Sequence, residues 1–527
     1  MTNPVSFPSG GAGRARSLTL LIACTSALAC GVSKPQGGPG TAGHGGFAGG
    51  TSGRGGTAGG GGAAGRGGAA SDGAAGAGAG GSGQAGGQAG HGAGGTGAGG
   101  ISQAAFSLLG APMVSAPTPH GFTLDTVLRA GEPARLQARV RAQGEATWID
   151  AGPAVAAAPD LARWSVSGLA AGRRYEYEVQ AAGDGASGPR TLYAGSAVTT
   201  RPAGSPFTFA MIADTHIEPR DPIPEGQTIP DDTWGVHETN MLSVMREIPA
   251  SEPDFVINLG DMLDYHIFGF NDPPPDSAWA RLGYLNYRRM LGDVLGQAAH
   301  FPVIGNWEGE NGCNTAEEIA RSTSQRVLYA PGPTPRTYPE SGSPNQDYYA
   351  FTWGDALFIV LNVMTYSPTC HLLGSGDGTP DDWTLGAAQL AWLEQTLARA
   401  TSRWRFTFIH HTVGGMAGNY DNSAYGRGGG QAAHVGEQAS IHAMLLKYGV
   451  QVFFYAHDHV FTDMVVDGVH YTMPGSAGAP WKFNASETGY QTYWPDSGYG
   501  RVRVTPDDVR VDLIAAGGQV LAGYDLK

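Results

Sequence analysis

The chain has 527 residues and a net charge of −14, with 46 Asp and Glu against 32 Lys and Arg. This length predicts two domains or more, and the acidic balance argues against a general nucleic-acid binder, which would present a basic face. Bound divalent metal would neutralise part of the acidic excess, so charge alone does not decide the class of protein.

The first 30 residues are typical of an export signal. Arg14 and Arg16 precede an apolar run over residues 18–29, which ends in Ala-Leu-Ala before Cys30. This order characterises signal peptides, and the run is too short to span a membrane. Cys30 resembles the lipidated cysteine of bacterial lipoproteins, although Cys24, after Leu-Ile-Ala, fits that pattern better and leaves a shorter apolar region. We expect an extracytoplasmic protein, either an outer-membrane lipoprotein or one secreted by cleavage before Cys30.

Residues 31–100 predict a disordered, glycine-rich tether. From Gly37 to Gly100 the sequence is nearly all Gly, Ala, Ser, Thr and Gln, and it holds much of the chain's total of 84 glycines. Such a tract lacks the apolar side chains that offset the entropy of ordering.

Two of the four cysteines, Cys313 and Cys370, lie outside the signal region, in loop-like sequence. An even pair in an exported protein favours a disulfide, and two free thiols are the alternative.

Residues 101–203 predict a small all-β sandwich. Short runs with period-two alternation recur between turn signals, at residues 134–140, 162–166, 175–179 and 197–200, which is the pattern of such a domain. The stretch from Gly168 to Tyr177 resembles the turn before a late strand of fibronectin type III domains, where a tyrosine packs at a sheet corner.

Residues 204–527 alternate apolar strand-like runs with helical patterns, which predicts a layered α/β domain. The predicted strands cover residues 207–213, 255–259, 301–304, 348–353, 356–362, 405–409, 450–455 and 469–473. The predicted helices cover residues 233–247, 278–295, 387–400 and 431–448, and long loops at 218–232, 264–275 and 311–346 are expected to form the rim of a cleft.

Several of these strands end at residue types that bind metal. In an α/β sheet, side chains at the carboxyl ends of strands converge on one crevice, and residues i and i+2 of a strand project the same way. The candidates form an ordered series along the chain: Asp214, His216, Asp261, Asn306, His410, His457 and His459.

This series resembles the calcineurin-like metallophosphoesterase family. The family pattern D-x-H, G-D-x-x-D, G-N-H-D/E, H and G-H-x-H is matched by Asp214-Thr-His216, Gly260-Asp261-Met-Leu-Asp264, Gly305-Asn306-Trp307-Glu308, His410 and Ala456-His457-Asp-His459. The resemblance covers nearly all of residues 204–480. It implies a four-layer α/β/β/α metallophosphatase sandwich, here preceded by the small β-sandwich.

The resemblance also implies two metal ions that share Asp261. Asp214, His216 and His459 would complete the first site, and the second would be completed by three further residues: Asn306, His410 and His457. His410 is preferred to His411 because in the family the first histidine of such a pair usually ligates. Mixed nitrogen and oxygen ligands suit Mn, Fe or Zn rather than Ca. Such a pair of ions hydrolyses phosphoesters with metal-activated water.

The sequence departs from the family at the proton donor. The histidine that usually follows the asparagine is Trp307, whose indole does no proton transfer at working pH, so Asp264 loses its expected partner. Three interpretations stay open. His411 or His266 substitutes for the missing histidine, or the leaving group is acidic enough to need no proton, or the protein binds phosphate or metal with little turnover.

The layout of a β-sandwich before a phosphatase domain is similar to that of purple acid phosphatases, but the ligands differ. Those enzymes begin with D-x-G and place a ligating tyrosine where this chain has Asp264, so we expect no purple colour. We expect an exported hydrolase of phosphomonoesters or phosphodiesters, whose substrates are small molecules or polymers. The alternative is a non-catalytic surface protein that binds partners through a phosphatase-like domain.

Overall fold

A computed structural model describes residues 106–131, 133–182, 188–217, 238–264, 277–312, 314–366, 384–410, 436–478, 490 and 492–527. The signal and tether regions, the two loop cysteines, His266 and His411 lie outside these residues. No helix within the described ranges is long and apolar enough to cross a membrane.

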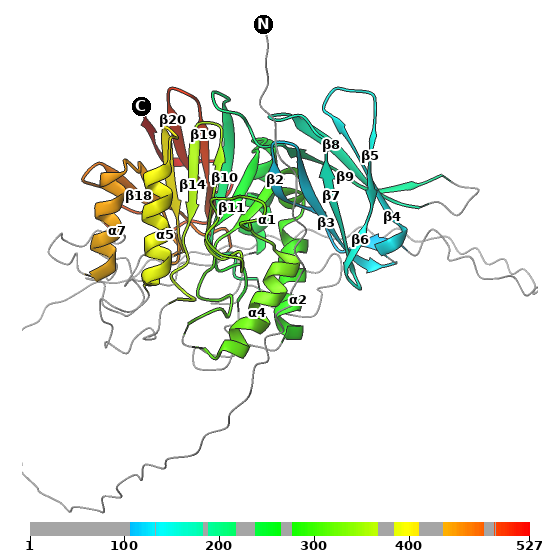
Figure 1. Cartoon of the computed structure of the whole chain (residues 1–527), viewed down its shortest axis with the longest axis horizontal. Coiled ribbons are helices and arrows are strands. Elements are labelled where there is room, and N and C mark those ends of the chain that lie inside the picture. Colours follow the sequence, from blue (N-terminus) through cyan, green and yellow to red (C-terminus); the bar gives the residue numbers. More distant parts are fainter. Residues whose placement is uncertain are drawn as a thin grey trace, which may run out of the picture. The chain divides into compact units, whose positions relative to one another are not determined.

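An eleven-stranded sheet forms the larger of the two main sheets (Figure 1). Its centre is three parallel strands, β10 (Phe207–Ile212), β11 (Phe255–Asn258) and β12 (Ala299–Pro302). Beyond β10 lie three antiparallel strands from the C-terminal part of the chain, β19 (Gly498–Val504), β20 (Val509–Ala515) and β21 (Val520–Leu526).

A six-stranded sheet faces it, in the order β13-β14-β15-β16-β18-β17. The strands are β13 (Tyr349–Trp353), β14 (Ala356–Val360), β15 (Trp404–Phe408), β16 (Val452–Phe454), β17 (Phe461–Val466) and β18 (Val469–Pro474). The four inner strands (β14, β15, β16 and β18) run parallel to one another. The edge strands β13 and β17 pair antiparallel with β14 and β18.

Side chains that alternate along the strands build the layers. In β10, Phe209 and Met211 enter the core between the two sheets, while Ala210 and Ile212 face the other way, as the period-two geometry of a strand requires. Phe209 and Phe358 meet edge to face across the two sheets, with ring centroids 5.2 Å apart. Strands buried on both faces read as nearly continuous apolar runs, which is why their positions could be predicted.

Helices cover the outer face of each sheet. The larger sheet packs against α1 (Glu238–Ala250), α2 (Ser277–Leu291), α3 (Asp293–Gln297) and the end of α4 (Ala316–Tyr329). The six-stranded sheet packs against α5 (Gly386–Arg399) and α7 (Gly436–Lys447), drawn in yellow and orange in Figure 1. The predicted four-layer α/β/β/α arrangement is therefore confirmed.

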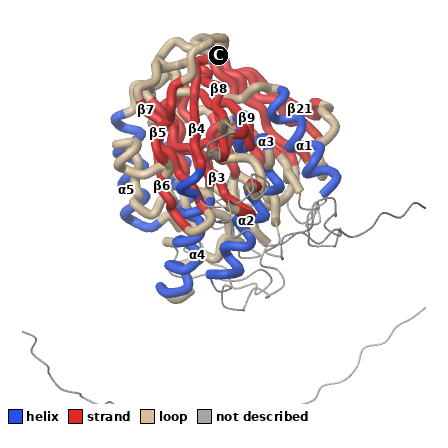
Figure 2. The backbone as a smooth tube through the Cα atoms, turned by 90° about the vertical axis from the view of Figure 1, so that its right-hand side faces the viewer, coloured by secondary structure: helices blue, strands red, loops and turns tan. Residues whose placement is uncertain are grey.

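The N-terminal described region is all β, as predicted, with antiparallel pairings. It contains β1 (Ser107–Leu108), β2 (Met113–Thr118), β3 (Gly121–Ala130), β4 (Leu136–Ala142), β5 (Ile149–Pro153), β6 (Val155–Ala158), β7 (Leu161–Ser167), β8 (Arg174–Ala181) and β9 (Arg190–Val198). β5, β4, β8 and β9 form a separate sheet, seen face-on in Figure 2. The strands β2, β3, β7 and β6 instead extend the eleven-stranded sheet, because β2 pairs in parallel with β12.

Two predicted elements differ from the structure. The helix predicted over residues 278–295 is two helices, because Gly292, with a φ of 49°, separates α2 from α3. The loop predicted over 311–346 contains α4, whose core-facing residues include Ser322, Arg326 and Tyr329. Because two of these three are polar, the helix lacks the apolar periodicity that would have predicted it.

Candidate metal centre

The seven residues predicted to ligate metal all follow the carboxyl ends of strands. In the eleven-stranded sheet, β10, β11 and β12 lie side by side and lead to four of them: Asp214, His216, Asp261 and Asn306. In the six-stranded sheet, β15 and β16 lead to the other three: His410, His457 and His459. Parallel neighbours present their carboxyl ends at one sheet edge, so two facing sheets bring both sets together.

Five of these residues have the left-handed backbone conformation, with φ values between 44° and 81°: Asp214, His216, Asp261, His457 and His459. Such a conformation costs about 1–3 kcal/mol for a residue other than glycine, and clusters of it mark functional sites. The surrounding hydrogen bonds hold it: Asp214 and His216 donate their N–H groups to the carbonyls of Gly260 and Asp261, at 3.0 and 2.9 Å.

The first ligand group consists of Asp214, His216, Asp261 and His459, whose ligand atoms all lie within 4.8 Å of one another. Nε2 of His216 lies 3.4 Å from Oδ2 of Asp261, and Nε2 of His459 lies 3.6 Å from Oδ1 of Asp214. All four side chains are buried. They offer two carboxylates and two imidazoles, a donor set that suits a transition metal.

The second group shares Asp261 and adds His410 and His457. In the amide orientation that satisfies its contacts, the side-chain nitrogen of Asn306 lies 2.9 Å from Nε2 of His410 and 3.0 Å from Nδ1 of His457, and its oxygen accepts from Nε1 of Trp307 at 3.2 Å. Nε2 of His410 lies 3.1 Å from Oδ2 of Asp261. Nδ1 of His410 lies 2.8 Å from the carbonyl of Leu259. A hydrogen bond to this carbonyl fixes the tautomer that leaves the lone pair of Nε2 facing the group, as is usual for a metal ligand.

These contacts test whether the residues fit metal. Within each group, one ligand atom of every member lies within 4.8 Å of those of the others, close enough for a single cation to bind them all. Oδ2 of Asp214 is buried and accepts no hydrogen bond from the described residues, and buried polar atoms are normally satisfied. The residues present therefore fit a metal centre.

Burial and the neighbouring charges shift the pKa values of the candidate ligands. Burial raises the pKa of Asp214 to about 7 against the opposing effect of His410. Burial also opposes protonation of His410, but the neighbouring Asp261 outweighs it and raises the pKa of His410 to about 9. Buried charges are costly unless they are paired, so a bound cation would stabilise the ionised carboxylates of Asp214 and Asp261.

Glu308 braces the loops that carry the ligands, a role that the sequence did not reveal. Its carboxylate, which is fully buried, accepts from the N–H groups of Gly305 at 2.5 Å, Met262 at 2.6 Å and Asp261 at 3.2 Å. It therefore joins the loop after β11 to the loop after β12. A carboxylate that accepts several N–H groups looks like any other acidic residue in a sequence, so only its place in the motif hinted at its importance.

Trp307 and Asp264 both lie next to His216. Nδ1 of His216 is 3.5 Å from Oδ2 of Asp264, and the Trp307 ring meets the His216 ring edge-on, with centroids 5.8 Å apart. Asp264 is 1% exposed. His411 and His266, the other two predicted catalytic residues, lie outside the described residues, so their positions relative to this group stay predictions.

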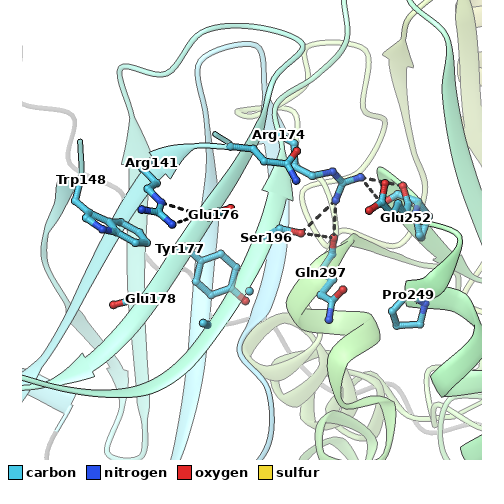
Figure 3. Close-up of a pocket in the computed structure, with 14 residues that line it drawn as sticks. Arg141, Trp148, Arg174, Glu176, Tyr177, Glu178, Ser196, Pro249, Glu252 and Gln297 are labelled. Carbon is cyan, nitrogen blue, oxygen red and sulfur yellow. Dashed lines mark hydrogen bonds and ion pairs between the residues drawn. The ribbon is translucent and has the colours of Figure 1, made fainter. Parts of the chain in front are cut away.

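A cavity of about 410 Å³ lies elsewhere, between the four-stranded sheet and the ends of α1 and α3 (Figure 3). In Figure 3, Arg174 extends from β8 toward Glu252 and Gln297, and its guanidinium donates to their carbonyls at 2.9 and 3.5 Å. Glu252 and Gln297 precede β11 and β12. The cavity is therefore at the amino ends of strands whose carboxyl ends lead to the ligands, and it is not part of the metal centre.

Comparisons with known proteins place the fold and the family. The structure of PhoD is similar with a TM-score of 0.59 and 15% identity, over 80% of this chain and 90% of that one. GAP50 of Plasmodium aligns with a TM-score of 0.37 and 14% identity, over 61% and 89%. A predicted phosphoesterase of Streptococcus pneumoniae aligns with a TM-score of 0.26 and 11% identity, over 62% and 99%. No curated protein matches the sequence.

The likeness to PhoD confirms the fold, and the match to a phosphoesterase family model together with the buried Asp and His groups defines the class of metal-dependent phosphoesterases. The model of the calcineurin-like phosphoesterase family matches residues 207–461, and this part of the chain belongs to that family. The family predicted from the five motifs is therefore confirmed. The protein is a hydrolase of phosphoester bonds.

Proposed function

We propose that the protein is an exported phosphohydrolase that holds two divalent or trivalent metal ions, of Mn, Fe or Zn, and cleaves phosphomonoesters or phosphodiesters. The observation that carries the proposal is the sharing of Asp261 by two buried ligand groups. One carboxylate common to two sites holds two cations close together, and ions about 3.5–4 Å apart are the arrangement used for in-line displacement at phosphorus.

The chain's own residues would act mainly by holding and orienting. Asp261 lies between the groups, and its Oδ1 accepts from the N–H of Trp307 at 2.9 Å, which fixes the plane of the carboxylate. When bound, the cations supply Lewis-acid charge to the phosphoryl oxygens and lower the pKa of a water molecule. Trp307 excludes solvent at one side and cannot supply a proton. A proton for the leaving group would come from His411 or His266, or from Asp264, or the leaving group would be acidic enough to depart without one.

Metal-dependent hydrolysis tests the proposal. We expect the metal-free full chain to gain activity toward p-nitrophenyl phosphate or bis-p-nitrophenyl phosphate when Mn²⁺, Zn²⁺ or Fe²⁺ is added, and the ratio of the two rates to give the preferred ester. Asp261→Asn should abolish this gain, because both sites lose a charged ligand. Asp347→Asn, which neutralises an equally buried carboxylate bonded to Tyr366 and Asn362, should retain it. No turnover of either ester by a chain that holds two ions would contradict the proposal.

The proposed location rests on residues 1–100, whose sequence favours export, a lipid anchor at Cys30 and a tether. In a Gram-negative host, the full chain should incorporate labelled palmitate and fractionate with the outer membrane, whereas Cys30→Ala should lose the label. Labelling that persists in Cys30→Ala and disappears in Cys24→Ala would assign the lipid anchor to Cys24. An unlabelled chain in the medium would support plain secretion, and a chain confined to the cytoplasm would contradict export.

A further inference from the structure

We propose that Asp264 is a positioning residue for His216: it accepts the Nδ1 proton of that histidine and so directs the Nε2 lone pair toward the first metal site. This inference rests on the proposed function, because it assumes that His216 ligates an ion. It gives Asp264 a task other than protonating the leaving group.

The backbone places these two side chains together. After β10 and β11 end, the segments 214–217 and 260–264 continue side by side in parallel. Ile217 donates its N–H to the carbonyl of Met262 at 3.1 Å, and Asp264 donates to the carbonyl of Ile217 at 3.0 Å. Ile217 and Leu263 also form an isolated parallel bridge. Asp264 is therefore anchored by hydrogen bonding to the residue that follows His216.

The ring of His216 is oriented with one nitrogen toward each carboxylate. Nε2 lies 3.4 Å from Oδ2 of Asp261, the shared ligand, and Nδ1 lies 3.5 Å from Oδ2 of Asp264. At these distances both are ion-pair contacts and not hydrogen bonds, so the proposal is that the contact with Asp264 tightens to a hydrogen bond when the ring binds metal. A neutral imidazole carries one proton, and the ring nitrogen that binds metal must be the other one. A carboxylate at Nδ1 selects the Nδ1–H tautomer and raises the basicity of Nε2, as in carboxylate–histidine–metal triads.

The surroundings make this contact effective. His216 and Asp264 are each 1% exposed, so little water competes for the Nδ1 proton, and electrostatic interactions are stronger where water is excluded. Trp307, which is 9% exposed, packs with its ring edge-on to His216. Where the family pattern has a histidine as partner for Asp264, this chain has an indole that accepts no proton, and the carboxylate faces His216 instead.

In this proposal His216 and His410 are both oriented through Nδ1, but by different acceptors. His410 is oriented by a backbone carbonyl, that of Leu259 at 2.8 Å, whereas His216 is oriented by an ionisable side chain. Of these two histidines, only His216 can therefore lose the acceptor of its Nδ1 proton through a side-chain substitution. This difference gives the test its internal reference, because the second site should be unaffected.

The test is a titration of the metal-free full chain with Co²⁺, followed by its visible absorption. Removing the partner of a ligating histidine lowers metal affinity about 10–100-fold. We expect Asp264→Asn, which keeps a neutral acceptor, to weaken one of two binding steps about 10-fold, and Asp264→Ala, which keeps none, to weaken the same step about 100-fold. In the Zn²⁺-loaded wild type, long-range ¹H–¹⁵N spectra should show His216 protonated at Nδ1, and in the metal-free chain Asp264→Ala should shift the His216 ring from the Nδ1–H toward the Nε2–H tautomer.

Asp347→Asn is the matched control, since it removes a carboxylate that is also 1% exposed but contacts no ligand histidine; both of its binding steps should equal those of the wild type. If Asp264→Ala does not fold, the isosteric Asp264→Asn carries the test. Unchanged Co²⁺ affinity in Asp264 variants that lose activity only toward poor leaving groups would overturn the inference in favour of a general acid. A wild-type chain that binds no Co²⁺ would overturn the proposed function and the inference with it.

Discussion

His300 is a buried imidazole that the fold keeps neutral. Its Nε2 lies 2.7 Å from the hydroxyl of Tyr287, which accepts in turn from the side-chain amide of Asn258 at 2.9 Å. The tyrosine hydroxyl donates to His300 when Nε2 is the unprotonated nitrogen of the neutral ring. Burial, followed by the positive charge of Arg288, lowers the pKa of His300 from 6.5 to about 3.

This shift predicts a loss of stability in acid. Because the pKa of His300 is lower in the folded chain than in the unfolded chain, the unfolded chain binds more protons between pH 6.5 and about 3. As far as this group is concerned, the free energy of unfolding keeps its full value above pH 6.5 and falls by about 1.4 kcal/mol per pH unit below it. His300→Gln should reduce that slope in urea unfolding at pH 7, 6 and 5. An unchanged slope in His300→Gln would contradict the assignment.

Gly305 is required by the close approach of two ligand loops. A Cβ at this position would lie 2.3 Å from both the backbone nitrogen and Oδ1 of Asp261, and 2.9 Å from Oε2 of Glu308. We expect Gly305→Ala to displace Asp261 and to weaken both metal-binding steps in a Co²⁺ titration. Gly188→Ala, where a Cβ meets nothing within 4 Å, is the control. Equal Co²⁺ affinities in the two variants would show that the loops tolerate the displacement.

At the scale of residues, the clustering of the candidate ligands could be predicted, because residue type and order along the chain indicate it; their coordination of metal remains a prediction. The supporting residues could not be predicted. Glu308 acts through N–H groups of a loop distant in sequence, and the contact between Asp264 and His216 depends on how two segments pair beyond their strands. Neither relation leaves a pattern of residue types.

Helix α4 is held to the molecule by a buried ion pair. Arg326 donates to both carboxylate oxygens of Glu310, at 2.6 and 3.1 Å, and to the backbone carbonyls of Asn345 and Gln346. Both side chains are at most 1% exposed. Removing one partner of such a pair leaves a buried charge and costs about 3–5 kcal/mol.

We therefore expect Arg326→Ala to lower the free energy of unfolding by about 3–5 kcal/mol, measured with chemical denaturant. On the same helix, Arg321 pairs with Glu317 at 3.8 Å on the surface, and exposed pairs contribute about 0–1 kcal/mol. Arg321→Ala should thus be close to the wild type. A similar loss for both variants would mean that the arginine stems, and not the buried pair, stabilise the helix.

Prediction of the elements succeeded where burial produces a pattern. The eight strands predicted for the α/β region are all present, with ends within two residues. Helix α4 was missed because polar side chains face its core, although Thr315 and Glu318 form a capping box that marks its start. The C-terminal strands β19, β20 and β21 were not predicted either, even though Val502, Val504, Val509 and Val511 alternate along two of them.

At the scale of the whole molecule, the all-β region and the α/β layers are joined by more than the chain. β2 pairs with β12, and Arg201 binds the carboxylate of Asp254 through two nitrogens, at 2.6 and 2.9 Å. The hydroxyl of the fully buried Tyr177 donates to the carbonyl of Gly296 at 2.8 Å. These contacts link residues on both sides of the domain boundary predicted at 203–204, which remains a prediction.

We expect residues 101–527 to unfold in one calorimetric transition. Gly195→Val should lower the temperature of that whole transition, because a Cβ there would lie 2.3 Å from the carbonyl oxygen of Gly296. Gly188→Val, at a position with open space, should leave it unchanged. A separate early transition that appears only in Gly195→Val would show instead that the all-β region melts independently.

The left-handed backbone of five ligand positions has a consequence for the history of the site. Among residues other than glycine, this conformation is adopted most readily by Asn, Asp and His, and these are also residue types that bind metal. Coordination and backbone geometry thus select the same side chains at Asp214, His216, Asp261, His457 and His459. Single exchanges among the three residue types change the charge of the site while the backbone conformation is kept. An ancestral site of this kind could alter its preferred ion without first rebuilding its loops.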